Sequence, residues 1–447
     1  MALDKVTVGV LADDAVATAK VADDAVTGAK IENNPTVAGN LTVAGNTTLS
    51  GTSTLTGNAT ASGNLTVTGD IIPSTPFSHR NLIINGAFQV WQRSNSTSLE
   101  TVANNNLKAD RFKLNSDIQA ADLTCARSTD VPAGQGFTNS MKVVPGGADT
   151  SVASSHIATI VQYIEAQSLQ HLCYGTSNAK TLTLSFWVKT NLTGLHSVCL
   201  VKPDSTNYAC PIEYTVSAAN TWEKKEITFS PTAGSTSLIT SSAGAIANDI
   251  GRGMSVCWNL AAGSTYRGTN NTWQAGPASE YGLGTGTIQN FVGSTSNTFF
   301  LTGCQLELGS NATPFEHRSY GEEFIRCERY YSTSFEDHIK PVGTPASAFN
   351  NKHLYFHIYP YTGAHFAGIQ VVYKTKMRTS PSVTFWTGRG SPSADSGRVA
   401  YWEGSWASNN GFSVDTTGSG PFGFNLGGTI SSSTRLCQFN FTADAEL

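Results

Sequence analysis

The chain has 447 residues, enough for two or three domains with hydrophobic cores of their own. Only 13% of the residues are charged, below the roughly 25% of an average soluble domain, whereas glycine, serine, threonine and asparagine are abundant. The net charge of −4 provides no basic surface, and no apolar run approaches the ~18 residues of a membrane span, so we expect neither nucleic-acid binding nor membrane insertion.

This composition favours β-structure with many turns and an uncharged polar surface. The eight cysteines are never closer than eleven residues apart, so the sequence has no CxxC spacing, and we expect buried free thiols. The first residues, Met1–Lys5, lack the apolar segment of a signal peptide. We therefore expect a protein that is made in a cytoplasm and not exported by a classical signal.

Residues 1–35 contain a short repeat. Ala12–Val16 recurs ten residues later as Ala22–Val26, on a five-residue spacing of apolar side chains. Side chains five residues apart do not share one face of a helix, and they do not share one face of a strand. The spacing is typical of an arm laid against another surface or around a symmetry axis, and disorder in the isolated chain is the alternative.

Residues 36–76 contain six hexads in register, each with one glycine. The glycines are Gly39, Gly45, Gly51, Gly57, Gly63 and Gly69. Two positions before each lies a small apolar residue, in order Val37, Val43, Leu49, Leu55, Ala61 and Val67. A fixed period this short indicates a repeat architecture, in which glycine allows a turn and threonine and valine favour extended backbone.

Burial energies show that this repeat cannot stand alone. One buried Val or Leu per hexad gains roughly 1.5–3 kcal/mol, whereas ordering six residues costs roughly 1–2 kcal/mol each. We therefore predict that three chains wind around a common axis as a rigid shaft, so that the protein is a homotrimer. A single-chain β-helix and a disordered linker remain the alternatives.

From residue 77 to residue 318 the pattern becomes globular. Alternating apolar runs with turn-rich intervals between them predict an antiparallel β-sandwich. In the run 181–189 the expected core face carries Leu182, Leu184, Phe186 and Val188. Trp187 is then expected on the other face of that strand.

A helical neck is predicted over 319–340. Ser319 and Glu322 form a capping-box pattern, and Glu322 with Arg326 makes an i,i+4 pair. Beyond it, residues 341–447 predict a second β-sandwich. Its expected strands are 353–359, 367–375, 382–386, 398–403, 411–415 and 434–441.

Three stretches resemble known proteins. They are the arm repeats Ala12–Val16 and Ala22–Val26, the stretch Asn81–Arg93 with Ala109–Phe112, and the junction 303–323, which runs on to Tyr331. Together they resemble bacteriophage tail fibres, in particular receptor-binding fibres of phages from aquatic bacteria. The second stretch is similar to the opening of the carbohydrate-binding-module-like jelly roll of such fibres.

The resemblance implies a homotrimer in the virion tail, assembled in the host cytoplasm. The N-terminal arm (1–35) would contact a tail or baseplate protein. The C-terminal sandwich (341–447) would be the receptor-binding head, which binds a host-surface glycan or receptor. The predicted fold class is therefore an all-β, elongated homotrimeric fibre, with a repeat shaft and two jelly-roll-like sandwiches joined by a helical neck.

Two clusters are candidate sugar-binding sites, because a sugar packs on an aromatic ring while amides and hydroxyls bind its hydroxyl groups. The first comprises Tyr266 and Trp273 in a polar loop, with Tyr281 nearby. The alternative for this loop is that it folds its tryptophan onto the sandwich.

The second cluster comprises Tyr401, Trp402, Trp406 and Asn409, which resemble the tip of a hairpin. The alternative is packing in a core or between subunits.

Catalytic signatures are absent from the sequence. It has no G-x-S-x-G, H-E-x-x-H or phosphate-loop motif, and its carboxylates are few. We therefore expect no enzyme activity, no cofactor and no metal. Two alternatives to adhesion stay open: a structural head or baseplate fibre, and a surface-polysaccharide depolymerase whose paired carboxylates come from distant positions.

Overall fold

The computed structural model divides the chain into two compact units, 1–71 and 72–447. It describes residues 42–43, 46–48, 54, 59–60, 62, 66, 78–94, 99–101, 106–107, 109–118, 123–277, 281–335, 354–358, 367–386, 399–402, 406–409, 412–428 and 435–447. The arm over 1–35 lies outside the described residues and the hexads lie mostly outside them, so the shaft and the trimer remain predictions.

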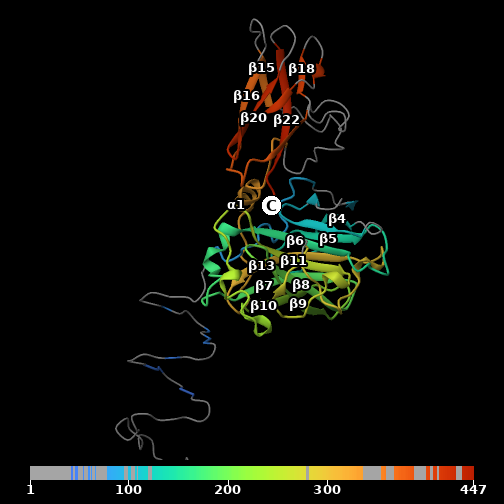
Figure 1. Cartoon of the computed structure of the whole chain (residues 1–447), viewed down its shortest axis with the longest axis vertical. Helices are drawn as coiled ribbons and strands as arrows, with labels where there is room; N and C mark the ends of the chain where they lie inside the picture. The colour runs from blue at the N-terminus through green and yellow to red at the C-terminus, as the bar shows by residue number, and fades with distance from the viewer. Residues whose placement is uncertain are drawn as a thin grey trace, which may run out of the picture. The chain divides into compact units, whose positions relative to one another are not determined.

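Two antiparallel sheets form the first globular region (Figure 1). The six-stranded sheet runs in the order β1 (Glu100–Thr101), β4 (Leu123–Ser128), β5 (Ser140–Pro145), β13 (Phe299–Leu308), β7 (Leu182–Thr190) and β10 (Glu223–Phe229). The seven-stranded sheet runs in the order β12 (Gln274–Ala275), β9 (Tyr208–Val216), β8 (Gly194–Lys202), β11 (Arg252–Ala262), β6 (Ile157–Glu165), β3 (Lys113–Ser116) and β2 (Asn106–Leu107).

The chain passes repeatedly from one sheet to the other, for example from β5 to β6, from β6 to β7 and from β9 to β10. Such crossings are typical of a jelly roll. Short 3₁₀ helices interrupt the connections at Ala166–Leu172, Ala233–Ser235, Ser242–Gly244, Ser264–Tyr266 and Phe291–Gly293. The predicted all-β sandwich is confirmed for this region.

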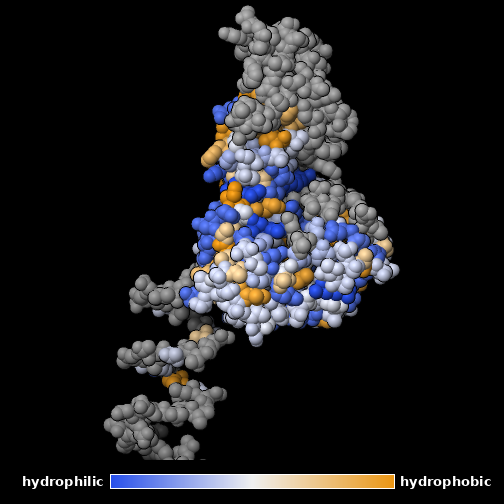
Figure 2. All heavy atoms as spheres, viewed as in Figure 1, coloured by the Kyte–Doolittle hydropathy of each residue, from blue (hydrophilic) through white to orange (hydrophobic). Residues whose placement is uncertain are grey.

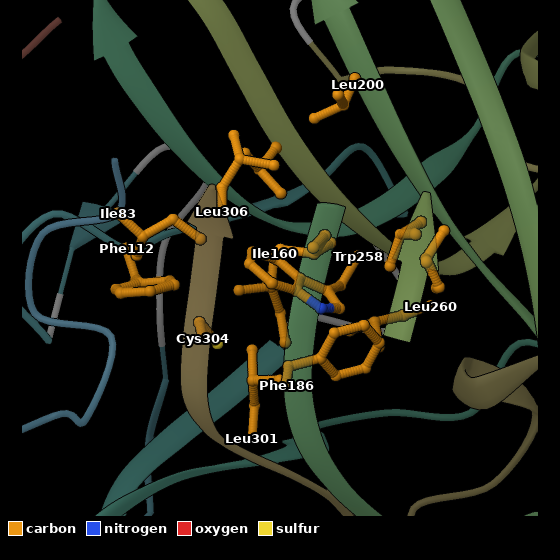
Figure 3. Close-up of a cluster of buried hydrophobic side chains, with 14 of the residues drawn as sticks. Ile83, Phe112, Ile160, Phe186, Leu200, Trp258, Leu260, Leu301, Cys304 and Leu306 are labelled. Carbon is orange, nitrogen blue, oxygen red and sulfur yellow. The ribbon is translucent and has the colours of Figure 1, made fainter. Parts of the chain in front are cut away.

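The core lies between the two sheets (Figure 3). The predicted core face of β7 is confirmed, because Leu182, Leu184, Phe186 and Val188 are all fully buried. Phe186 meets the buried Trp258 of β11 edge-on, with ring centroids 5.8 Å apart. Burial of each large side chain stabilises the fold by about 1.5–3 kcal/mol, so this layer holds the two sheets together.

The predicted helix is present as α1 (Tyr320–Glu328), but it is shorter than the predicted neck of 319–340, because residues 331–333 form a strand instead. The side chain of Ser319 accepts a hydrogen bond from the backbone N–H of Glu322, and Arg326 lies 3.0 Å from the carboxylate of Glu322, so both predicted contacts are confirmed. The chain then enters β14 (Tyr331–Thr333). No helix in the described part of the chain is long and apolar enough to cross a bilayer.

The described residues of the C-terminal region also form β-sheets. One sheet joins β14, β22 (Arg435–Asp444), β18 (Val399–Trp402) and β19 (Trp406–Asn409), and β15 (Leu354–Ile358) and β17 (Ser382–Trp386) also pair with β22. A second sheet has the order β16 (Ala367–Val372), β21 (Gly423–Gly428) and β20 (Phe412–Gly420). Six of these strands were predicted, although β20 and β22 continue further and β16 ends earlier; β19 and β21 were not among the predicted strands.

Figure 2 shows the surface that this composition produces. On the face in view, the sandwich carries mostly residues of intermediate hydropathy, with scattered apolar and strongly polar ones among them. Of the seven cysteines whose side chains the structure describes, all but the half-buried Cys173 are buried free thiols.

Candidate functional site

The outward face of the six-stranded sheet carries a regular arrangement of aromatic and polar side chains. Because β7 alternates, Ser185, Trp187 and Lys189 point away from the core. The strand register places Trp187 between Thr302 of β13 and Lys224 of β10. Two residues further along β7, Lys189 lies beside Phe300 of β13.

Trp187 lies at a hollow of about 500 Å³, which we call the Trp187 pocket. Its lining comprises Gly134, Gln135, Phe137, Ser185, Trp187, Lys224, Gly303, Ala312, Pro314, Phe315 and His317. The Phe137 ring centroid lies 5.0 Å from that of Phe315 and 5.2 Å from that of His317. The pocket thus offers flat apolar rings beside an amide, a hydroxyl and an ammonium group.

A β-bulge shapes this pocket. The register between β13 and β7 shifts between Thr302 and Gln305, and Gly303 at the shift has a φ of +64°. A Cβ at this glycine would lie 2.6 Å from Cζ of Phe137 and 3.0 Å from Cδ1 of Trp187. Glycine therefore lets the two rings approach, and bulges of this kind often lie next to functional sites.

Replacing Gly303 with alanine is expected to destabilise the protein by about 1–3 kcal/mol and to displace the rings, because the added methyl group has no room. Gly134→Ala is the matched control, since Gly134 also has a positive φ (+74°) but nothing within 4 Å of the added carbon. Urea denaturation of both variants measures the difference. Equal losses would show that backbone strain, and not crowding of the rings, sets the cost.

A second aromatic group adjoins the pocket on the same face. Trp222 donates from Nε1 to Oδ1 of Asp130 (2.9 Å), and Lys189 forms an ion pair with the same carboxylate. The Lys189 ammonium also lies 4.7 Å from the Phe300 ring centroid. Burial alone would raise the pKa of Asp130, but the hydrogen bonds from Lys189 and Trp222 outweigh it and lower the pKa below its ordinary value.

This lowered pKa predicts an acid-sensitive tryptophan. The ion pair stabilises the fold fully above the ordinary pKa of about 3.9, and the stabilisation is lost as the pH falls through the lower folded value. We expect the fluorescence of Trp222 to change below about pH 4. The measurement is the difference in emission between the wild type and Asp130→Asn. A difference that stays constant down to pH 2 would contradict it.

Only part of the first predicted site, the cluster of Tyr266, Trp273 and Tyr281, lies at the surface of the protein. Tyr266 and Tyr281 are half-buried, with ring centroids 6.5 Å apart. Trp273, however, is only 1% exposed, and its Nε1 donates to the backbone oxygen of Ser230 (2.8 Å). The assignment of Trp273 as a sugar-stacking residue was therefore wrong, and the alternative that the loop folds it onto the sandwich is confirmed.

The second predicted site lies on a hairpin, as expected. In β18 and β19, Trp402 is directly opposite Trp406, Tyr401 is opposite Ala407 and Asn409 is opposite Val399. The side chains of this hairpin lie outside the described residues, so its role in binding remains a prediction.

Sequence reasoning missed Phe137, Phe315, His317 and Trp222. The available signal was Trp187, which the alternation of β7 already placed on the outward face. The junction stretch itself supplies Gly303, Phe315 and His317 to the pocket.

The described residues of this site include neither a group of metal ligands nor a pair of catalytic carboxylates in the pocket lining. Within the described part of the chain, no three His, Cys, Asp or Glu residues group as metal ligands would. The lining of the Trp187 pocket includes no carboxylate, whereas most glycosidases use two.

No family model and no curated protein matches this chain. Among solved structures, the family 11 carbohydrate-binding module of Clostridium thermocellum Lic26A-Cel5E is 12% identical, over 50% of this chain and 99% of that one, with a TM-score of 0.23.

Two further solved structures are similar to part of the chain. The CBM22-1 xylan-binding domain of Paenibacillus barcinonensis Xyn10C is 7% identical over 49% of this chain and 99% of that one (TM-score 0.23). The enzymatically active domain of tailspike protein 4 of bacteriophage CBA120 is 12% identical over 51% of this chain and 21% of that one (TM-score 0.24). Scores this low show no family, so the functional case depends on the residues of the site.

Proposed function

We propose that this chain is a non-catalytic carbohydrate-binding adhesin and that the Trp187 pocket is its primary contact. The observation that carries the proposal is the composition of that pocket: four rings, an amide, a hydroxyl and a lysine, with no carboxylate in the lining. The rings would pack against the C–H face of a sugar, and the polar groups would bind its hydroxyls.

The wider setting of this proposal is a phage tail fibre. The hexads and the three resembling stretches support a homotrimer whose arm contacts a tail or baseplate protein and whose globular regions bind a bacterial surface. Three copies of a weak site raise overall affinity by ~10²–10⁴ when all engage together, which suits shallow, mostly neutral pockets. Light scattering of the purified chain is expected to give three times its mass of 47.3 kDa.

A glycan array probed with the full-length protein tests the binding. We expect signal on a subset of glycans and a loss of roughly tenfold or more in affinity for Trp187→Ala, because the stacking surface and its buried area disappear. Phe422→Ala is the matched control, since that ring is 64% exposed and lies in the C-terminal region. Binding that survives in Trp187→Ala, or an array without signal, would contradict the proposal.

The hairpin of β18 and β19 is a second candidate for the same function, because the register sets Trp402 directly opposite Trp406. A full-length variant with both tryptophans changed to alanine distinguishes the two. Loss of array signal in this variant, with Trp187→Ala unaffected, would move the binding site to the hairpin.

A further inference from the structure

A second hollow lies at the beginning of β7. It has a volume of about 520 Å³ and is lined by Lys180, Thr181, Leu308, Gly309, Ser310, Asn311 and Thr313. We call it the Lys180 pocket. Unlike the Trp187 pocket it has no aromatic residue, and its side chains are mostly hydroxyls and an amide around one ammonium group.

The two pockets share a wall. Thr313 lines the Lys180 pocket, whereas its neighbours Ala312 and Pro314 line the Trp187 pocket. Thr181, directly before β7, belongs to the first pocket and Ser185 of β7 belongs to the second, a separation of about 13 Å at 3.3 Å per residue. A linear chain of a few sugar units has the length to contact both pockets at once.

The charged side chains around the two pockets do not balance one another. Lys180 is exposed and forms no ion pair within the described part of the chain, and neither does Lys142 on the same sheet. The described carboxylates of this face are paired: Asp130 with Lys189, Glu226 with Lys224 (2.7 Å), and the buried Glu307, which accepts from Thr313 (2.7 Å), with Arg80 (3.9 Å). Neither pocket lining includes a carboxylate. The face is therefore positive although the whole chain carries −4.

We propose that the ligand is an acidic polysaccharide that is bound along its length, with a ring of one unit on Trp187 and a carboxylate of another unit at Lys180. This inference depends on the proposed sugar binding and adds the chemical class of the ligand. A charge-assisted hydrogen bond from the Lys180 ammonium to a uronic acid carboxylate supplies the selectivity, while the hydroxyls of the pocket accept and donate to the rest of the unit.

Affinity electrophoresis of the full-length protein tests the charge. The probes are polygalacturonate, alginate and hyaluronate, each beside its own carboxyl-reduced, neutral form. We expect retardation by at least one acidic polymer, weaker retardation by its reduced form, and a further loss at 0.5 M salt because exposed charges are screened. Lys180→Gln is expected to weaken binding of the acidic polymer by about two- to fivefold, and to leave binding of the reduced form unchanged.

Lys376→Gln is the control, because it removes the same charge from an exposed site in the C-terminal region. The proposal is overturned if no acidic polymer retards the protein, if the reduced form binds equally well, or if Lys180→Gln and Lys376→Gln behave alike. If one of these outcomes occurs while Trp187→Ala still weakens binding on the array by roughly tenfold or more, sugar binding stands and only the acidic ligand is ruled out.

Discussion

Glu165→Ala is expected to destabilise the unit formed by residues 72–447 by about 3 kcal/mol, near the lower end of the cost of breaking a buried ion pair. The Glu165 side chain at the end of β6 is 2% exposed. It accepts hydrogen bonds from Nε of Arg329 (2.7 Å), from the hydroxyl of Tyr330 (2.6 Å) and from Nε2 of Gln167 (2.6 Å). Because Arg329 and Tyr330 follow α1 directly, the loss would loosen the helix from the sandwich.

Urea denaturation followed by circular dichroism measures this loss. Glu165→Gln keeps the shape of the side chain and is expected to lose less, about 1–2 kcal/mol, because an amide oxygen still accepts from Tyr330. The matched control is Glu226→Ala, whose exposed pair with Lys224 is expected to contribute less than about 0.5 kcal/mol. A Glu165→Ala variant as stable as Glu226→Ala would refute the role of this carboxylate.

The fold was largely predictable from the sequence because each strand carries its own signal. In β7 the alternation of apolar and polar residues identified both the strand and its core face, and the capping-box residues identified the start of α1. These features depend on neighbours two to four positions away. They can therefore be recognised in the sequence without knowledge of which distant segments contact each other.

The site was less predictable because its rings come from distant segments. Phe137, Trp187 and Phe315 meet only where the bulge at Gly303 lets them approach. Trp273 presents the opposite case. Its polar surroundings predicted an exposed loop, but the pairing of β12 with β9 and the hydrogen bond to Ser230 turn the indole inward. Local composition does not distinguish these two outcomes for a tryptophan.

The opening stretch Asn81–Arg93 and the junction 303–323 are hydrogen-bonded to each other. Asn81, in the opening stretch, donates to the backbone oxygen of Cys304 (3.0 Å) and accepts from the N–H of Leu306 (3.1 Å). From the junction, the Glu316 carboxylate accepts from the N–H of Asn81 (3.0 Å), and Arg318 donates to the Asn81 backbone oxygen (2.5 Å). Much of this pattern therefore specifies closure of the sandwich, while Phe315 and His317 contribute to the pocket.

Asn85→Ala is expected to cost about 4 kcal/mol, an exceptionally large loss for a single substitution. The side chain is fully buried; Nδ2 donates to the backbone oxygens of Val90 (2.9 Å) and Asp110 (3.0 Å), and Oδ1 accepts from the N–H of Val90 (3.0 Å). Alanine removes the partner of the Val90 N–H and of the Asp110 oxygen, and each buried group left unpaired costs about 1–3 kcal/mol, whereas the Val90 oxygen still accepts from the N–H of Asp110 (3.3 Å). Alanine is also strained at the φ of +60° that asparagine tolerates here.

Asn85→Gly separates the two causes, because glycine adopts a positive φ freely but restores none of the hydrogen bonds. We expect it to remain destabilised and to recover only about 1–2 kcal/mol of the alanine loss, the usual cost of a left-handed backbone in an L-residue. Thermal and urea denaturation of the three proteins measure both steps. If Asn85→Gly matches the wild type, backbone conformation alone holds this turn, and the amide network that ties Val90 to Asp110 contributes nothing to stability.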